Sequence, residues 1–310
     1  MNFSKKTWAL ILTTAILASA ITIFQTEYWG SYGFVTFLFV PLLIGLIPIY
    51  FLDENEPIRK SQVVIIGLTT LSIFSIILVL IGIEGMICIA MAAPIGTIIT
   101  LFGSFIAYIL RKNRKKEKGL TTTLIMLTTL SLFSYVDKNS TLSLNEAKTS
   151  IVVEANINTV WNNVITFPKL SEPKEYLFKA GISYPIEATI AGKGKGAIRY
   201  CKFNTGDFIE PITEWNEPNL LAFNVDQQPL PMKELSMYDI DAPHLHDYFL
   251  SKKGQFKLTK LSNNRTLLEG TTWYTHNIRP EFYWKLWSNY IIHRIHLRVL
   301  ENIKSNSEKN

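Results

Sequence analysis

The chain has 310 residues, enough for about two domains. Hydrophobic residues make up 48% and charged residues only 18%, which is apolar for a soluble protein and indicates two unlike parts. The net charge is +6, but 10 of the 31 Lys and Arg and 6 of the 25 Asp and Glu precede Asp137, so the part after residue 136 carries only +2. The basic pI of 9.1 therefore comes largely from loops between apolar segments. The sequence also contains no nucleic-acid-binding motif, so we expect no nucleic-acid partner.

Five apolar segments precede residue 137. A membrane-spanning helix needs about 20 apolar residues, and the first four segments meet this length. The fifth is shorter and rich in threonine, so the sequence leaves open whether it spans. We expect residues 1–136 to form a membrane region with four to five transmembrane helices, at Thr7–Phe24, Tyr32–Leu52, Gln62–Ile83, Met86–Leu110 and Leu120–Val136.

The basic residues of this region predict its orientation. Lys5–Lys6, Arg59–Lys60 and the six basic residues at 111–118 all lie on one side if the first four segments span. The positive-inside rule then places the N-terminus in the cytoplasm, and we expect an integral plasma (inner) membrane protein. A spanning fifth segment places the C-terminal part outside the cytoplasm, as we expect. A fifth segment that lies on the membrane surface leaves that part in the cytoplasm.

Two alternatives concern the role of the apolar region. Lys5–Lys6, the apolar run and the small residues at 18–20 also fit a cleaved signal peptide. The run continues through Phe24, which favours a retained helix. Ionisable residues inside spans usually mark a transport pathway, and the five segments contain none, because Glu84 falls in a turn. We therefore predict an anchor that packs on itself, partly through the small residues Gly103 and Ala107.

The second part has the pattern of an α+β domain. Residues 137–148 are polar and predict a linker. Thr149–Ala155 alternates like a strand, and an amphipathic helix with Asn158 as candidate N-cap follows. About six further strands precede a long helix that begins after Pro280 and runs to about Lys304. The sequence GKGKG at 192–196 is typical of a hairpin turn. We predict a domain at 149–310 in which a curved antiparallel sheet packs on the C-terminal helix and leaves a cleft.

Two stretches resemble a known superfamily. VEANINTVWNNVITFPKL (153–170) is similar to the opening strand and helix of START-like (SRPBCC) proteins, also called the polyketide cyclase/dehydrase and lipid-transport group. GAIRYCKFNTGDFIEPITEWNEPNLLAFNV (196–225) resembles their central strands. The resemblance covers about Thr149 to Lys304 and implies a helix-grip fold around a cavity for a hydrophobic ligand. It transfers no catalytic residue, because the family has no universal ones. The membrane region is a departure that argues against simple cytosolic lipid shuttling.

Strand alternation and the apolar face of the last helix nominate cavity residues. A one-residue slip in a strand would exchange each position for its neighbour. Glu210 and Glu214 are expected to share a face, either as paired carboxylates for acid–base chemistry or as solvent-facing residues. The candidate apolar lining is Trp161, Tyr200, Trp273, Trp287 and Ile291, and the candidate polar anchors are Arg199, Glu210 and Arg298.

Neither the histidines nor the cysteines predict a metal or redox site. His244 and His246, like His293 and His296, are spaced so that two ligands could meet one ion. Zinc needs three or four ligands, and no HExxH or CxxC motif is present. Helical geometry also directs the last two histidines away from the apolar face, so hydrogen bonding is their expected role. The two cysteines predict no disulfide, because one lies in an apolar segment. We expect no metal and no cofactor.

Three functions remain open from the sequence. The first, which we expect, is a membrane-anchored START-like domain that binds a hydrophobic or amphipathic small molecule, such as a lipid. The second is a cyclase- or hydrolase-type enzyme that uses a cavity Glu, His or metal. The third is a structural or regulatory membrane protein whose cavity is filled by its own side chains. The expected partners are membrane lipids and the hydrophobic ligand, and the sequence identifies no protein partner.

Overall fold

The computed structural model describes residues 3–309, except 53–56, 113–118, 139–141 and 237. Most of the basic loop at 111–118 and part of the predicted linker lie outside the described residues. The chain divides into two units. Unit 1 comprises Met1–Thr141, Glu234–Pro243 and Ile278–Tyr283, and unit 2 comprises Leu142–Lys233, His244–Asn277 and Trp284–Asn310. The sequence does not indicate that two later segments belong to unit 1.

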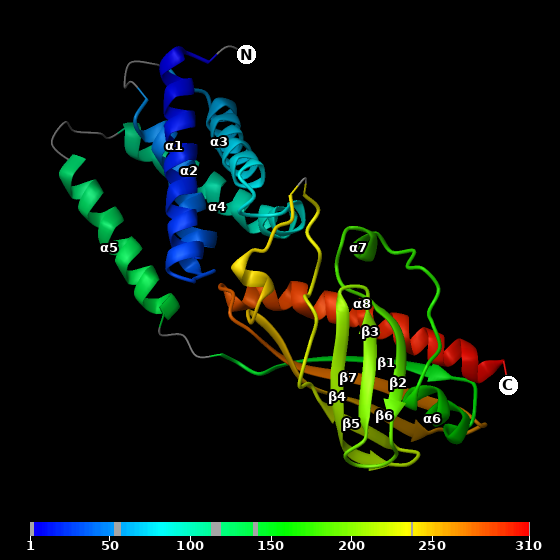
Figure 1. Ribbon diagram of the computed structural model, residues 1–310. Coiled ribbons are helices and arrows are strands. Elements are labelled where there is room, and N and C mark those ends of the chain that lie inside the picture. Colours follow the sequence, from blue (N-terminus) through cyan, green and yellow to red (C-terminus); the bar gives the residue numbers. More distant parts are fainter. Residues whose placement is uncertain (1–2, 53–56, 113–118, 139–141, 237, 310) are drawn as a thin grey trace. The chain divides into compact units, whose positions relative to one another are not determined.

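Unit 1 is helical (Figure 1). Its helices are α1 (Lys5–Ile23), α2 (Val40–Tyr50), α3 (Lys60–Leu80), α4 (Met86–Lys112) and α5 (Gly119–Lys138). A π-helical turn, Phe24–Tyr28, extends α1, and another, Val35–Phe39, precedes α2. In the described part of the chain, Lys5–Tyr28, Lys60–Leu80 and Met86–Arg111 are long and apolar enough to cross a membrane. The first, third and fourth predicted membrane segments are thus confirmed as helices of suitable length and composition.

The second helical segment is shorter than the sequence indicates. It runs only from Val35 to Tyr50, because the backbone just before it forms hydrogen bonds with residues that are distant in the sequence. The carbonyl of Tyr32 accepts a hydrogen bond from the Arg279 amide at 2.8 Å. The carboxylate of Asp137, at the end of α5, accepts from the amides of Phe34 at 2.8 Å and Val35 at 3.3 Å. A carboxylate at these orphan amides caps the helix start.

Close packing of α2 and α4 confirms a helix contact at Gly103. A Cβ atom added there would lie 2.4 Å from the Leu42 carbonyl oxygen, and one added at Gly45 would lie 1.9 Å from that of Thr100. The hydroxyl of Ser104 donates to the Gly45 carbonyl at 3.3 Å. Small residues therefore let the two backbones approach, as is common between membrane helices.

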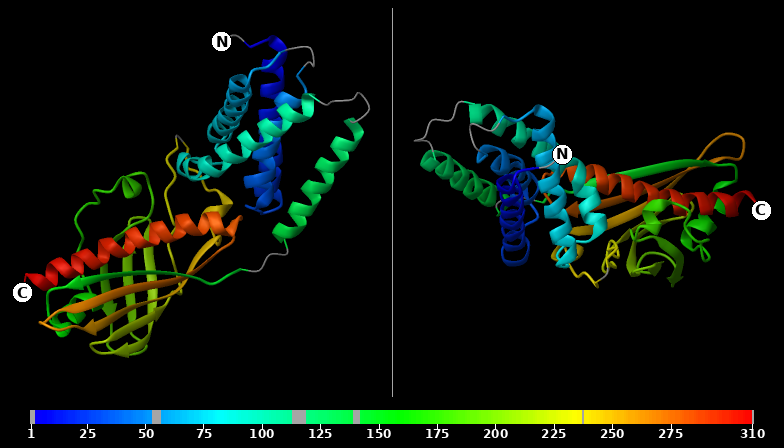
Figure 2. Two further views of the ribbon diagram at one scale, coloured as in Figure 1. Left: turned by 180° about the vertical axis from the view of Figure 1, so that it is seen from behind. Right: turned by 90° about the horizontal axis from the view of Figure 1, so that it is seen from above.

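Unit 2 is a seven-stranded antiparallel sheet that curls around one long helix (Figures 1 and 2). The order β1-β7-β6-β5-β4-β3-β2 and the C-terminal helix confirm the predicted helix-grip architecture. The strands are β1 (Asn145–Val153), β2 (Pro185–Ala191), β3 (Ile198–Phe203), β4 (Gly206–Asn216), β5 (Leu220–Asn224), β6 (Phe249–Lys260) and β7 (Thr266–His276). The helices are α6 (Ile157–Ile165), α7 (Tyr176–Lys179) and α8 (Glu281–Glu308), and a short turn of 3-10 helix covers Pro243–Leu245.

Local signals place the ends of several elements. The predicted N-cap at Asn158 is wrong by two residues, because the side chain of Asn156 accepts from the Thr159 amide at 3.0 Å and starts α6 earlier. The strand β1 begins at Asn145, inside the stretch predicted to be a linker. The hairpin turn at 192–196 is confirmed. Its three glycines have φ values of 89°, 86° and 90°, a region that other residues rarely adopt.

Candidate functional site

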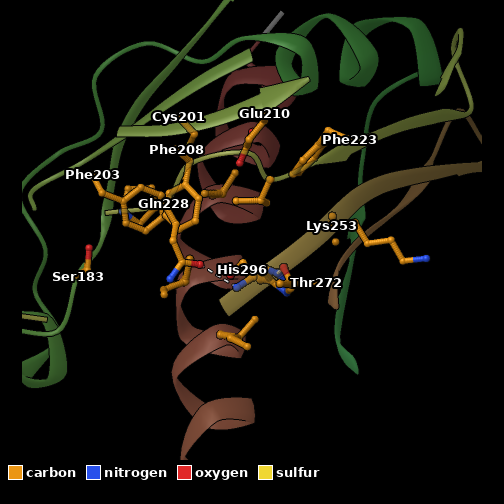
Figure 3. Close-up of a pocket in the computed structure, with 18 of the residues that line it drawn as sticks. Ser183, Cys201, Phe203, Phe208, Glu210, Phe223, Gln228, Lys253, Thr272 and His296 are labelled. Atoms are coloured by element: carbon orange, nitrogen blue, oxygen red, sulfur yellow. Dashed lines mark hydrogen bonds between the residues drawn. The ribbon is translucent and has the colours of Figure 1, made fainter. Parts of the chain in front are cut away.

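A cavity of about 140 Å³ lies in unit 2 between α8 and the sheet (Figure 3). Its wall is largely aromatic and aliphatic, with Phe203, Phe208, Phe223 and Phe256 on the sheet side and Ile291 and Ile295 on α8. A cavity of about 150 Å³ is large enough to bind benzene. The space therefore fits a single aromatic ring or a short acyl segment.

The loop after β5 forms another wall of this cavity through residues 228–231. Gln228 fixes it to β6: its amide nitrogen donates to the Phe249 carbonyl at 2.6 Å, and its amide oxygen accepts from the Ser251 amide at 2.8 Å. The amide of Asp226 donates to the Ile209 carbonyl on β4 at 3.0 Å. The loop is thus hydrogen-bonded to two strands that also line the cavity.

An ion pair between Arg199 and Glu210 lies in the cavity wall. The two residues face each other on the neighbouring strands β3 and β4, and their exposed fractions are only 2% and 6%. The guanidinium also lies over three rings, those of Phe167, Phe223 and Phe256, at 5.5 to 5.6 Å from their centroids. Buried charges of this kind need both a partner and further polar contacts.

Electrostatics keep Arg199 charged at this site. Burial disfavours its charge, but the Glu210 carboxylate beside it raises the pKa of Arg199 above its usual value. Burial also raises the pKa of Glu210, and the guanidinium opposes that rise. The Nε atom of Arg199 is buried and has no hydrogen-bond partner among the described residues. A hydrogen-bond donor without an acceptor is therefore present in the wall of the cavity.

A β-bulge separates Glu210 from Glu214. The register of β4 against β5 shifts between Ile212 and Glu214, so side chains beyond the shift change faces. Glu210 consequently points inward while Glu214 is exposed. The expectation that they share a face is wrong, and Glu210 is not a solvent-facing residue. The same shift turns Trp215 inward, where its ring packs edge-on against Trp161 with centroids 5.7 Å apart.

Three of the eight predicted site residues lie together on the cavity: Arg199, Glu210 and Ile291. Trp161 is fully buried in the core beside Trp215 and does not line the cavity. Tyr200 is 38% exposed, because it alternates with inward-facing neighbours on β3.

Trp273 and Trp287 also lie away from the cavity lining. Trp273 occupies the face of β7 opposite to Thr272, and its ring nitrogen donates to the Glu146 carboxylate at 3.0 Å. The ammonium of Lys253 lies 4.6 Å from the Trp273 ring centroid. Trp287 is partly buried on α8 but does not reach the cavity wall.

Arg298 bonds to backbone instead of lining the cavity. It donates from Nε to the Pro185 carbonyl at 3.1 Å and from Nη2 to the Ser171 carbonyl at 2.5 Å. Its guanidinium lies 5.2 Å from the ring centroid of Tyr184, and partial burial lowers its pKa. Arg298 therefore ties α8 to the segment that leads into β2.

The prediction that His296 points away from the cavity is wrong. His296 lines the cavity, because β1 and β7 curl around α8 and cover an arc of the helix that is wider than its apolar face. Its Nδ1 lies 3.1 Å from the hydroxyl of Thr149. Its Nε2 lies 2.8 Å from the hydroxyl of Thr272, and these two side chains lie side by side in Figure 3. Burial, assisted by the nearby His293, lowers the pKa of His296 to about 4. Thr149 and Thr272 were not among the residues nominated from the sequence. The signal that could have found them is a polar residue at a strand position that faces inward.

Comparisons with known proteins give similarity to solved structures alone. No protein-family model matches the sequence, and no curated protein matches it. Among solved structures, a START superfamily protein from Mycobacterium smegmatis is similar, with 12% identity over 54% of this chain and 99% of its own, at a TM-score of 0.36. An aromatase/cyclase from a Streptomyces species has 11% identity over 54% and 95%, at a TM-score of 0.36. Norcoclaurine synthase from Thalictrum flavum has 13% identity over 54% and 95%, at a TM-score of 0.35.

The architecture itself carries the assignment of fold. Seven antiparallel strands hold the long helix α8, and a cavity lies between them. The chain thus combines a helix-grip domain with an N-terminal group of apolar helices.

Proposed function

We propose that unit 2 binds a small amphipathic molecule in the cavity between α8 and the sheet. The observation that carries this proposal is the unfilled apolar space whose wall contains the buried Arg199 with an unpartnered Nε donor. A cavity in a core lowers stability, and so does a buried polar atom without a partner. A ligand that fills the space and accepts from Nε offsets both costs.

The lining indicates the character of this ligand. Small-molecule sites are largely apolar and contain a few polar groups that set orientation. The phenylalanine rings suit a flat ring or a short acyl segment, and Arg199 suits an oxygen acceptor such as a carbonyl or carboxylate. A lipid fits this cavity only through a short part of its acyl chain, with the rest of the molecule outside.

A cavity-filling variant tests the proposal. In Ile295→Trp, the larger ring occupies the cavity, so we expect binding of 4-nitrophenol, a single-ring probe, to weaken about tenfold or more, since about 1.4 kcal/mol is tenfold. Binding is measured by calorimetry on the full chain in detergent, together with mass spectrometry of molecules that co-purify with it.

Leu286→Trp is the matched control, because Leu286 lies on the same helix but is 68% exposed. It should bind the probe like the wild type. The proposal would be abandoned if the wild type retained no apolar molecule and showed no thermal shift with the probe, or if Ile295→Trp bound as tightly as the control.

We also propose on which side of the membrane unit 2 lies. The apolar helices suit an integral membrane protein, and the basic loops favour a cytoplasmic N-terminus with unit 2 on the other side of the plasma (inner) membrane. Ser262, an exposed residue in the β6–β7 turn, can be changed to cysteine for labelling. We expect a membrane-impermeant maleimide to label Ser262→Cys in intact cells. Labelling only after permeabilisation would place unit 2 in the cytoplasm.

A further inference from the structure

A chain of hydrogen bonds runs from the exposed side of α8 to the cavity wall. His293 is exposed, whereas Thr149 on β1 is only 3% exposed. The Thr149 hydroxyl lies 2.9 Å from His293 Nδ1 and 3.1 Å from His296 Nδ1. His296 Nε2 then lies 2.8 Å from the hydroxyl of Thr272, and both His296 and Thr272 line the cavity. Four side chains therefore connect solvent to the ligand space without a gap.

The hydroxyl of Thr149 couples the two imidazoles. It has one hydrogen and two lone pairs, so it can donate to one Nδ1 while it accepts from the other. A neutral imidazole carries its hydrogen on one of its two nitrogens. When Thr149 bridges the rings in this way, His293 and His296 hold opposite tautomers: where one carries hydrogen on Nδ1, the other carries it on Nε2.

Two complete arrangements satisfy this rule. In the first, His293 donates to Thr149, Thr149 donates to His296, His296 donates to Thr272, and the Thr272 hydrogen is free to point into the cavity. In the second, every bond is reversed, so Thr272 donates to His296 and offers a lone pair to the cavity. The wall can thus present either a donor or an acceptor to an oxygen of the ligand.

Building on the proposed function, we propose that His293, Thr149, His296 and Thr272 form a proton relay for a cavity ligand with an ionisable oxygen, such as a phenol or enol. In one passage, His293 Nε2 takes a proton from water, and its Nδ1 passes one to Thr149. Thr149 passes its own hydrogen to His296 Nδ1, and His296 Nε2 passes one to Thr272. The Thr272 hydroxyl proton goes to the ligand oxyanion. One proton enters, one leaves, and the relay moves from the first arrangement to the second.

The surroundings suit transfer rather than storage of a proton. His296 is neutral at neutral pH, since its pKa is lowered to about 4 by burial and by His293. The charged groups nearby are already paired: Lys148 with Glu269 on the opposite face of β1 and β7, and Arg199 with Glu210 across the cavity. Other polar side chains that line the cavity in the described part of the chain include Gln228, which is bonded to the backbone of β6, and Lys253, which lies over the Trp273 ring. Tyr274 lies outside the lining, and its hydroxyl donates to Asn289 at 2.7 Å.

Nitrogen NMR of the histidine rings tests the hydrogen-bond chain without any ligand. In full-length protein with ¹⁵N-labelled histidine, assigned by His293→Gln and His296→Gln, we expect opposite tautomers for His293 and His296 at neutral pH. In Thr149→Val the coupling is lost, and we expect the His293 tautomer to become independent of His296. The same tautomer for both rings in the wild type would overturn the relay.

Proton transfer itself is tested with 4-nitrophenol, whose colour reports its ionisation. After a pH jump, we expect the bound probe to ionise faster than it dissociates from the wild type. In Thr149→Val, the rate should fall by about 100-fold, the size of effect typical of positioned proton transfer, or to the dissociation rate if that is reached first. Thr149→Ser keeps the hydroxyl and should restore the rate.

The two proposals fail in different ways. If 4-nitrophenol does not bind the wild type, the proposed function is lost, and the tautomer spectra alone decide the relay. If the probe binds but ionises at the same rate in the wild type and in Thr149→Val, ligand binding stands and the relay is wrong.

Discussion

Glu210→Leu is expected to lower the free energy of unfolding of unit 2 by about 3–5 kcal/mol. The variant leaves the Arg199 charge buried among three phenylalanine rings with no carboxylate beside it. In the double variant Arg199→Met/Glu210→Leu, both charges are gone and side chains of similar size fill the space. We expect the double variant to be close to the wild type or more stable, because both desolvation costs are removed. Denaturant unfolding of the full chain in detergent, followed by tryptophan fluorescence, measures these changes.

The exposed ion pair between Lys202 and Glu187 provides the matched control. It joins the neighbouring strands β2 and β3 at 3.4 Å, and Glu187→Gln should cost no more than about 1 kcal/mol. A double variant as unstable as Glu210→Leu would show that the buried pair is kept for stability. A stable double variant that no longer binds 4-nitrophenol would instead tie the pair to the ligand.

Acidification is expected to destabilise unit 2 through His296. Its pKa falls from 6.5 to about 4 on folding, with burial as the main cause. Above about pH 6.5 the ring is neutral in both states and adds no pH dependence. Between about pH 6.5 and 4 the unfolded chain binds a proton that the folded chain does not, so stability falls as the pH falls. The loss is up to roughly 3 kcal/mol across this window.

The pH dependence of unfolding in wild type and His296→Gln measures this contribution. The glutamine amide still bonds to threonine hydroxyls but does not titrate, so the curve should be flatter in the variant. His244 is also buried with a pKa lowered to about 4, and it is present in both proteins, so the difference between their curves reports His296. The exposed His293→Gln should keep most of the slope. Parallel curves for wild type and His296→Gln would contradict the prediction.

The features that the sequence predicts well are those set by local pattern. Long apolar runs mark α1, α3 and α4, because any continuous apolar helix of that length carries the signal in its composition alone. Alternation and turn residues mark the strands, and the glycines at 192–196 mark a turn that only they adopt readily. The order of these elements implies the sheet that holds α8, so the fold follows from the sequence.

The features that the sequence predicts poorly depend on contacts between residues that are distant in the chain. One bulge in β4 reverses the side-chain faces beyond Ile212 and separates Glu214 from Glu210. A tertiary hydrogen bond to Arg279 and the cap from Asp137 shorten the second apolar helix.

Taken alone, the sequence determined that this protein joins apolar helices to an antiparallel sheet that packs on a long helix, because composition and periodicity carry that information locally. It also placed Arg199, Glu210 and Ile291 on the cavity side. Only the tertiary structure decided that His296 belongs there too, held between Thr149 and Thr272. The physical reason is the curl of the sheet: β1 and β7 cover a helix face that helical periodicity alone assigns to solvent.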